Sequence, residues 1–298
     1  MSEVNINLIK DAEVNEQDVQ LLAADHLLEE GHVSHEVTLF AEPIWHIKNF
    51  TITNSLINSW IVVLIVIVLS VMIRKGLKKI PSRFQAAVEM VVDGALNMAD
   101  SVTGDRHKTK KIFPLAFGVF IFILLNNWLG LLPGVGSIGF IETHGSEKVF
   151  VPLLRGATAD FNTTLVLALM SVVGANIFGI ISVGAWKYFN KFINFHALAE
   201  IPKKIVKEPT IAMVNPIKFF VGLIEIVGEV AKVASLSFRL FGNIFAGEVL
   251  LTSIAIIFAF IAPIPFMFLE VIVGIIQALI FSMLTLVYFS VAATAEEH

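Results

Sequence analysis

The stretch SLSFRLFGNIFAGEVLL, residues 235–251, places charged side chains in a segment that is otherwise apolar. Arg239 and Glu248 both lie within a run that extends from Ile211 to Phe268. An ionised side chain at the centre of a bilayer costs roughly 2.5–3.5 kcal/mol on insertion scales, so such a residue usually marks a functional site. The stretch therefore predicts a membrane helix whose polar groups handle ions.

Helical geometry separates these polar residues into two faces. At about 100° per residue, Ser235, Arg239 and Asn243 follow one another along one face. The same polar stripe includes Lys232 and Glu225. Glu248 points to roughly the opposite side, so we expect it in a separate polar pocket. Arg239 is then expected to have no ion-pair partner in its own chain. The alternative is that Arg239 packs against a carboxylate elsewhere in the sequence. Because its guanidinium keeps its proton at every accessible pH, Arg239 is a fixed charge and not a proton carrier.

The composition is that of a polytopic helical membrane protein. Of its 298 residues, 56% are hydrophobic and 15% are charged, whereas ordinary globular domains carry about 25% charged residues. The absence of cysteine excludes disulfides and thiolate metal sites, and the net charge of −4 argues against a nucleic-acid partner. The acidic N-terminus lacks the basic and apolar blocks of a signal peptide, so insertion into lipid must rely on internal spans.

Three spans are predicted before the long apolar run. They cover about residues 55–74, 112–132 and 160–187. The domain boundary is placed near residue 50, with residues 1–50 as a polar tail or short surface helix and residues 51–298 as the membrane domain. Between the first two spans, residues 82–103 combine an apolar face with an acidic stripe, which is typical of a helix at the membrane interface or against a partner.

Basic residues predict the orientation of the chain. They cluster between the first two spans: Arg74, Lys75, Lys78, Lys79, Arg83, Arg106, Lys108, Lys110 and Lys111. By the positive-inside rule this region faces the cytoplasm, which places the N-terminus outside and the C-terminus inside. The glycine-rich loop of residues 133–159 is then outside as well.

The third span carries local signals of its own. It begins with DFNTTL, where Asp160 is the expected helix N-cap. Gly174, Gly179 and Gly184 are expected to allow close helix contact. The remaining candidate cluster, formed by His26, His32 and His35 in the N-terminal region, matches no common metal spacing, so we expect no metal site.

The long apolar run from Pro216 to Ile261 is too long for one upright span. As a straight helix it would measure roughly 69 Å at 1.5 Å per residue, against a hydrocarbon core of about 30 Å. Either it folds back near Gly242 or Gly247, or it lies steeply tilted with a partner covering its polar side. After the break APIPF, residues 266–293 form the last hydrophobic helix.

Two polar residues of this last helix share a face. Glu270 and Gln277 are two helical turns apart, and Tyr288 falls about 20° from Gln277. Because Glu270 lies deep in apolar sequence, a functional role is favoured for it, as it is for Glu248.

At this point the motifs resemble a known family. NPIKFF, SLSFRLFGNIFAGE and GIIQALIFSMLTLVYFS together resemble subunit a of bacterial F-type ATP synthases, the stator half of the proton channel. The resemblance runs from about residue 50 to the end and is densest over 215–298. It implies an all-α polytopic membrane protein with a steeply tilted C-terminal helical hairpin, of about 216–261 and 266–293, packed against a ring of c subunits.

The resemblance also implies roles for single residues. Arg239 takes the position of the family's essential arginine, which faces the carboxylates of the c-ring. The resemblance also implies a proton path. Its entry side is lined by Glu248, Glu270, Gln277 and Asn127, and its exit side by Glu225 and Glu229. Asn243, Ser235 and Lys232, on the polar stripe of Arg239, complete the path. Two positions depart from the pattern: Glu270 stands where several bacterial members carry histidine, and Gly130 where some relatives have an aspartate.

The implied mechanism is electrostatic. Each c subunit carries a carboxylate that is neutral when it faces lipid and ionised when it meets Arg239. A charge pair at about 4 Å is worth on the order of 4 kcal/mol at an effective dielectric of 20, which favours deprotonation beside the arginine. The implied partners are the c-ring, the b-subunit peripheral stalk, the soluble ATPase head and membrane lipid. The implied location is the bacterial cytoplasmic membrane, with no cofactor and no catalytic site in this chain alone.

Other interpretations stay open at this stage. An ion-coupled secondary transporter would also place charges in the membrane, although no internal repeat is visible. An intramembrane hydrolase lacks a nucleophile motif here, and a scaffold would have no reason to keep Arg239 in lipid. Among single residues, Glu225 and Lys232 could form a plain interfacial pair, and Asn126 and Asn127 could serve only helix–helix hydrogen bonds. Protons are favoured over sodium, because the acids can relay them without a coordination cage.

Overall fold

The architecture was analysed in a computed structural model, which describes residues 33–34, 38–48, 50–132, 134–144, 147–192, 211–258 and 261–294. Five of its helices are long and apolar enough to cross a membrane. They are α3 (Asn54–Gly76), α5 (Arg106–Gly130), α6 (Phe161–Val183), α9 (Ile211–Ile257) and α10 (Pro263–Thr294). Two further helices, α4 (Arg83–Thr103) and α7 (Ala185–Phe192), do not meet that criterion. The prediction of an all-α polytopic membrane protein is confirmed.

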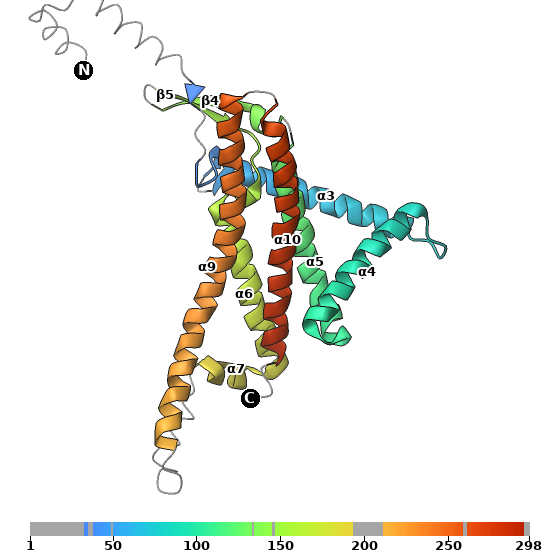
Figure 1. Cartoon of the computed structure of the whole chain (residues 1–298), viewed down its shortest axis with the longest axis vertical. Helices are drawn as coiled ribbons and strands as arrows, with labels where there is room; N and C mark the ends of the chain where they lie inside the picture. Colours follow the sequence, from blue (N-terminus) through green and yellow to red (C-terminus); the bar gives the residue numbers. More distant parts are fainter. Residues whose placement is uncertain are drawn as a thin grey trace, which may run out of the picture.

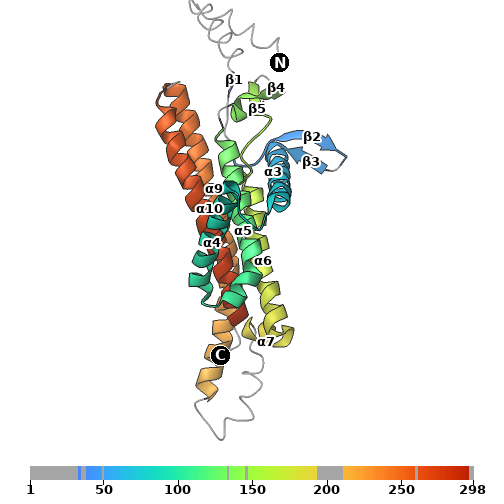
Figure 2. The ribbon, with the colours of Figure 1, turned by 90° about the vertical axis from the view of Figure 1, so that its right-hand side faces the viewer.

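The C-terminal hairpin dominates the molecule (Figure 1). α9 is one continuous helix of 47 residues, which corresponds to about 70 Å. The alternative of a fold-back near Gly242 or Gly247 is therefore wrong, because both glycines lie inside the helix. The chain turns only after Ile257, and α10 returns antiparallel along α9 (Figures 1 and 2). The N-terminal end of α9 extends beyond the other helices of the bundle (Figure 1).

α3 is oriented differently from the rest. It runs crosswise to α5, α6 and α10 and leads away from the bundle, and α4 brings the chain back (Figure 1). α4 begins after the N-cap Ser82, whose side chain accepts a hydrogen bond from the Gln85 amide, and ends at Gly104 in the left-handed region with φ of 68°. It packs against α5 and α10. Its residue range, 83–103, is close to the range of 82–103 that was predicted for an interfacial helix.

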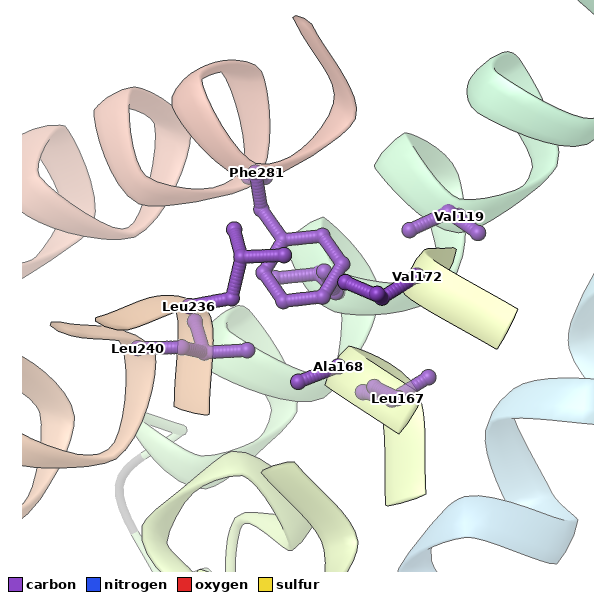
Figure 3. Packing of buried hydrophobic residues seen from close by; sticks show 9 residues of the cluster. Val119, Leu167, Ala168, Val172, Leu236, Leu240 and Phe281 are labelled. Carbon is purple, nitrogen blue, oxygen red and sulfur yellow. The ribbon is translucent and has the colours of Figure 1, made fainter. Parts of the chain in front are cut away.

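The core holds α9 against three other helices. Its buried residues come from α5, α6, α9 and α10 (Figure 3): Val119, Ile123, Leu167, Ala168, Val172, Leu236, Leu240, Ala278 and Phe281. A second cluster, with Ala99, Ile112 and Leu286 among its members, attaches α4 to the same bundle. Since Leu236 and Leu240 are each only 1% exposed, the orientation of α9 about its own axis is fixed by packing.

Small strands cover one end of the bundle. β4 (Gly139–His144) and β5 (Glu147–Pro152) form an antiparallel hairpin, and β1 (Val33–Ser34) pairs in parallel with β5. β2 (Pro43–Ile47) and β3 (Phe50–Thr53) form a second hairpin just before α3. These strands were not predicted: residues 1–50 were expected as a tail or surface helix, residues 51–53 only as the start of the membrane domain, and residues 133–159 as a loop. They are short, and they are held by long-range pairing that no local sequence pattern reports.

The glycines of the third span have two different uses. A Cβ on Gly174 would lie 3.1 Å from the ring of Phe289, and one on Gly179 would lie 2.4 Å from the ring of Tyr188. Both positions therefore allow close packing, as expected. Gly184 has no such neighbour; it ends α6 with φ of 93°, a conformation that favours glycine.

The N-cap predicted at Asp160 is confirmed, since its side chain accepts a hydrogen bond from the Asn162 amide. The residue is only 4% exposed and also accepts from Thr163 Oγ1 at 3.0 Å and from the Ala41 amide at 3.3 Å. We expect Asp160→Ala to cost about 1–2 kcal/mol, the upper range for a lost cap. This would lower the Tm in detergent by about 2–4 °C per kcal/mol.

A matched control for this prediction is Asp105→Ala. Asp105 caps α5 through one hydrogen bond, from the His107 amide at 2.8 Å, and is exposed. Its loss should lower the Tm less, whereas Asp160→Asn should retain most of the stability because an acceptor oxygen remains. Equal losses for the two alanine variants would contradict the tertiary role of Asp160.

Several sequence expectations lie outside the described residues. These are the histidine cluster of His26, His32 and His35 and most of the polar tail of residues 1–50.

Candidate functional site

Arg239 lies on the outward face of α9. Its neighbours Leu236 and Leu240 point into the core, whereas the side chains of Arg239, Ser235 and Asn243 are exposed. Arg239 Nη2 donates a hydrogen bond to Ser235 Oγ at 3.2 Å. No carboxylate among the described residues forms an ion pair with it. The guanidinium is thus presented to whatever lies against this face.

Exposed apolar side chains occur along both helices of the hairpin that carries Arg239. Phe238 is 60% exposed, and further along α9 Ile224 and Val227 are 68% and 65% exposed. On α10, Ile272 and Ile276 are exposed as well. A face with this composition suits lipid or a hydrophobic protein partner, not water.

The two predicted acids line one cavity near the α9–α10 turn. Its volume is about 190 Å³, and its walls come from α5 and the loop after it, from α9 and α10, and from the segment before α6: Asn126, Asn127, Gly130, Leu131, Gly136, Gly156, Ala159, Ile244, Glu248, Leu251, Thr252 and Glu270. Glu270 is 7% exposed, and no hydrogen bond to its carboxylate occurs within the described part of the chain. Gln277 is 9% exposed but does not line this cavity. The structure therefore brings Glu248, Glu270 and Asn127 together and leaves Gln277 outside.

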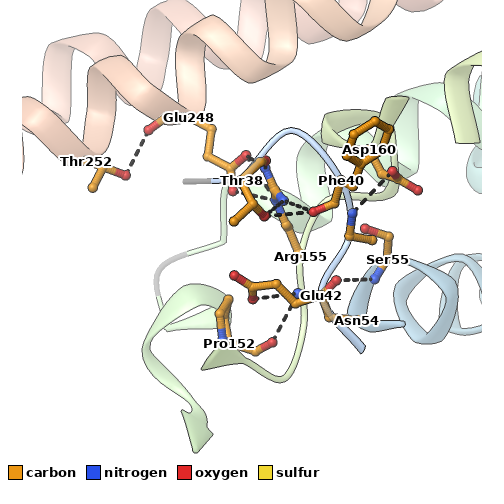
Figure 4. Close-up of polar contacts among 11 residues, drawn as sticks. Thr38, Phe40, Glu42, Asn54, Ser55, Pro152, Arg155, Asp160, Glu248 and Thr252 are labelled. Carbon is orange, nitrogen blue, oxygen red and sulfur yellow. Dashed lines mark hydrogen bonds and ion pairs between the residues drawn. The ribbon is translucent and has the colours of Figure 1, made fainter. Parts of the chain in front are cut away.

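Glu248 has a partner that sequence reasoning missed. Arg155, which is only 5% exposed, donates from Nη2 to Glu248 Oε2 at 2.8 Å and from Nε to Oε1 at 3.0 Å (Figure 4). Arg155 belongs to the stretch PLLRGATAD just before α6. A signal was present in the sequence, because this arginine lies in a loop expected on the side that the positive-inside rule leaves poor in basic residues.

The asparagines combine structural and cavity positions. Asn126 Oδ1 accepts a hydrogen bond from Asn58 Nδ2 at 3.2 Å, which links α5 to α3. Asn127 Nδ2 donates to the Gly274 carbonyl at 3.1 Å, and its Oδ1 accepts from Thr158 Oγ1 at 2.6 Å. Both residues therefore make hydrogen bonds between chain segments, and both also face the cavity.

Two glycines shape this cavity. A Cβ built on Gly247 would lie 2.3–2.4 Å from the carboxyl atoms of Glu270, so the absence of a side chain there makes room for that carboxylate. A Cβ on Gly130 would lie 3.1 Å from Gly156 Cα. Gly130, one of the two departures noted in the sequence, therefore makes a close backbone contact that leaves little space for a larger residue.

A second polar cluster lies on the other side of Arg239 along α9. Glu229 accepts from Lys232 Nζ at 2.6 Å and from Asn176 Nδ2 at 3.3 Å. The Tyr188 hydroxyl donates to Asn176 Oδ1, and Lys232 Nζ lies 5.3 Å from the centroid of the Tyr288 ring. These side chains line a cavity of about 10 Å³, which has room for about one water molecule. Lys232 thus turns towards the bundle, and its ion pair is with Glu229, while Glu225 lies half-buried about one turn before.

Tyr188 contributes a neutral hydrogen-bond donor to this cluster. It lies on α7, outside the spanning helices, and is 3% exposed. Burial, together with the nearby carboxylates of Glu229 and Glu225, raises the pKa of Tyr188 to about 12. The phenol is therefore neutral at physiological pH and remains a hydrogen-bond donor to Asn176. Neither Asn176 nor Tyr188 was predicted, because their contacts join separate helices.

Comparison with known proteins identifies the family. A family model described as ATP synthase A chain matches residues 56–290. Subunit a of the ATP synthase of Syntrophobacter fumaroxidans is 34% identical over 244 residues, covering 80% of this chain and 83% of that protein. The corresponding protein of Geotalea uraniireducens is 31% identical over 230 residues, with coverages of 77% and 83%, and that of Mycobacterium bovis is 34% identical over 250 residues, with coverages of 82% and 88%. Since the family model extends from the first spanning helix into the last, the chain belongs to the ATP synthase A chain family.

Proposed function

We propose that this chain is the proton-conducting membrane stator subunit of a bacterial F-type ATP synthase. The single observation that carries the proposal is the position of Arg239. It is an exposed cation without an ion-pair partner among the described residues, on the apolar face of a long hairpin, between two polar clusters. An ion-coupled secondary transporter is not favoured, because it would require a translocation path enclosed by the chain itself, whereas this arginine faces outward.

The proposed role of Arg239 follows from its charge. A carboxylate on a rotating c subunit would be neutral in lipid and would ionise beside the guanidinium, since an opposite charge at about 4 Å is worth on the order of 4 kcal/mol at an effective dielectric of 20. The Ser235 hydroxyl accepts only one of the guanidinium's five N–H groups. The remaining donors stay free to pair with each passing acid.

The two polar clusters supply the two half-channels in this proposal. Glu248 and Glu229 lie about 14 Å and 15 Å from Arg239 along the helix axis, at 1.5 Å per residue. The cavity with Glu248, Glu270 and Asn127 would admit protons from outside. The cluster of Glu229, Lys232 and Tyr188, with Glu225 beside it, would release them to the cytoplasm. Asn243 and Gln277 are proposed to lie along the path near the ring. The fixed charge of Arg239 would keep the two paths electrically separate.

The orientation in the membrane is also proposed. If α3 crosses the bilayer upright, its crosswise arrangement (Figure 1) requires α9 and α10 to be steeply inclined. Such a tilt accommodates a helix of about 70 Å in a core of about 30 Å. The basic residues between α3 and α5 favour a cytoplasmic α4, an external N-terminus and a cytoplasmic C-terminus, in the bacterial cytoplasmic membrane.

The proposed partners are those of a rotary complex. They are the c-ring against the Arg239 face, the b-subunit peripheral stalk and the soluble ATPase head. The chain itself would carry no ATP-hydrolysing site, and its contribution to catalysis would be to couple proton passage to rotation. A proton that crosses 100 mV releases about 2.3 kcal/mol, which would drive each step of the ring.

The test is purification of the native complex followed by reconstitution into liposomes. We expect the chain to co-purify with a small hydrophobic subunit and an ATPase, and ATP to drive acidification of the vesicles without added sodium. A chain that purifies alone and transports ions by itself would overturn the proposal. Pumping that depends on sodium would keep the stator role but exclude protons as the ion.

A further inference from the structure

Arg155 uses all of its polar nitrogens in one buried network. Besides the two contacts with Glu248 described above, Nε lies 3.2 Å from Glu248 Oε2. Nη1 donates to Thr38 Oγ1 at 3.2 Å and to the Phe40 carbonyl at 3.3 Å, and Nη2 donates to the Thr38 carbonyl at 2.8 Å (Figure 4). A guanidinium offers five N–H groups in a planar fork. Here the guanidinium binds a carboxylate on one side and the Thr38 hydroxyl and two backbone carbonyls on the other, a pattern that lysine cannot reproduce.

The same network ties an N-terminal segment to the cavity wall. The Ala41 amide donates to Asp160 Oδ1 at 3.3 Å, and the Asn54 amide donates to the Glu42 carbonyl at 3.2 Å. Asn54 Nδ2 also donates to the Pro152 carbonyl at 3.3 Å. Residues 38–42 are thus fastened to the chain on both sides of Arg155. Arg155 joins this segment, the loop before α6 and helix α9 at one point.

Charge balance at the cavity depends on this pair. Among the described residues, the ionisable side chains that line the cavity are Glu248 and Glu270, and Arg155 is ion-paired to Glu248. A buried arginine needs a paired anion, because an uncompensated buried charge is strongly unfavourable. Glu248 supplies that anion through a two-pronged contact, whereas Glu270 has no partner within the described residues. The two acids, which look equivalent in the sequence, are in different electrostatic environments.

We propose that Arg155 is a positioning residue of the outer half-channel, fixing Glu248 as a permanent counter-charge and clamping residues 38–42 beside the cavity. The proposal rests on the function proposed above. It assigns the reversible proton uptake on the outer side to Glu270 and not to Glu248. Glu248 then contributes a constant negative charge that holds the arginine and the segment in place.

The experiment uses the whole complex in inverted membrane vesicles and compares ATP-driven proton pumping. Arg155→Gln should lower pumping at least tenfold, since it leaves Glu248 unpaired. The double variant Arg155→Gln/Glu248→Gln should pump several-fold faster than Arg155→Gln, because no unpaired charge remains, but more slowly than the native complex, because the hydrogen bonds to residues 38–42 stay lost. Arg155→Lys, which keeps the charge but loses the fork, should lie in between. Assembly is monitored by the amount of the chain in the membrane and by ATP hydrolysis.

Each outcome decides the proposal. A double variant that assembles but pumps no better than Arg155→Gln would mean that Glu248 itself relays protons, and an unchanged rate in Arg155→Gln would remove any role of the arginine. Rescue of assembly by the second substitution would support the pairing. If neither variant assembles, hydrogen exchange of the Ala41 amide in the complex decides: it should be faster in Arg155→Lys than in the native chain, and equal rates would overturn the clamp.

A parallel Arg239→Ala variant separates this inference from the proposed function. If Arg239→Ala still pumps, the proposed function fails whatever Arg155 does. If Arg239→Ala is inactive and the double variant is not rescued, only the role of Arg155 fails.

Discussion

Arg239→Ala should abolish ATP-driven proton pumping and ATP synthesis in membranes that contain the complex. Without the guanidinium, the neighbouring side chains Ser235 and Asn243 carry no charge to favour ionisation of a carboxylate that arrives from lipid, and the cation of Lys232 is already paired with Glu229. The loss should exceed a hundredfold, because removal of a charge pair worth on the order of 4 kcal/mol changes an equilibrium by about a thousandfold. Pumping is measured by dye quenching in inverted vesicles, and synthesis by ATP formation under an imposed gradient.

The matched control is Arg74→Ala. Arg74 is an exposed arginine in the last turn of α3, away from the hairpin, and its loss should leave pumping nearly unchanged. Arg239→Lys should retain little activity, because lysine presents a point charge without the planar fork. Coupled pumping at a normal rate in Arg239→Ala would exclude the proposed role of the residue.

Gly247→Ala should also have a large effect, through Glu270. The added methyl group would lie 2.3–2.4 Å from three carboxyl atoms of Glu270, a distance at which the carboxylate or the helices must move. Displacement of this group from the cavity should lower proton pumping at least tenfold while the complex still assembles. The measurement is again ATP-driven acidification, normalised to the amount of chain in the membrane.

A control and a rescue sharpen this prediction. Gly118→Ala on α5 adds the same methyl group where no atom lies within 4 Å, and pumping should be unaffected. In Gly247→Ala/Glu270→Asp, the shorter acid frees about one methylene of space, so part of the activity should return. A Gly247→Ala variant with native activity would show that the position of the Glu270 carboxylate does not matter.

The spanning helices could be predicted because hydropathy is a local property. The spans, the interfacial helix α4 and the N-cap at Asp160 all depend on neighbours within a few turns. Arg239 and Glu270 stood out for a related reason, since a charge in an apolar run is visible without knowledge of the fold. The continuous course of α9 was left open, because a glycine inside a helix and a glycine at a turn look alike in sequence.

Arg155 and the inner cluster could not be predicted in the same way. Arg155 meets Glu248 across 93 residues of sequence and Thr38 across 117, and Asn176 meets Glu229 across 53. The short strands depend on pairing of the same long-range kind. Periodicity assigns a side chain to a face of its own helix, but only the packing of several helices decides which partner that face meets.

The overhang of α9 bears on how the complex is put together. The N-terminal end of α9 extends beyond the other helices (Figure 1), and among the first described side chains of this helix Ile217, Phe220 and Val221 are 56–61% exposed. An exposed apolar helix end of this kind is unfavourable in water. In a newly made chain that lacks its neighbouring subunits, it would be accessible to proteases and chaperones. We therefore expect the chain to accumulate only when its hydrophobic partner subunits are synthesised at the same time. Cells would then contain little of this chain outside the assembled complex.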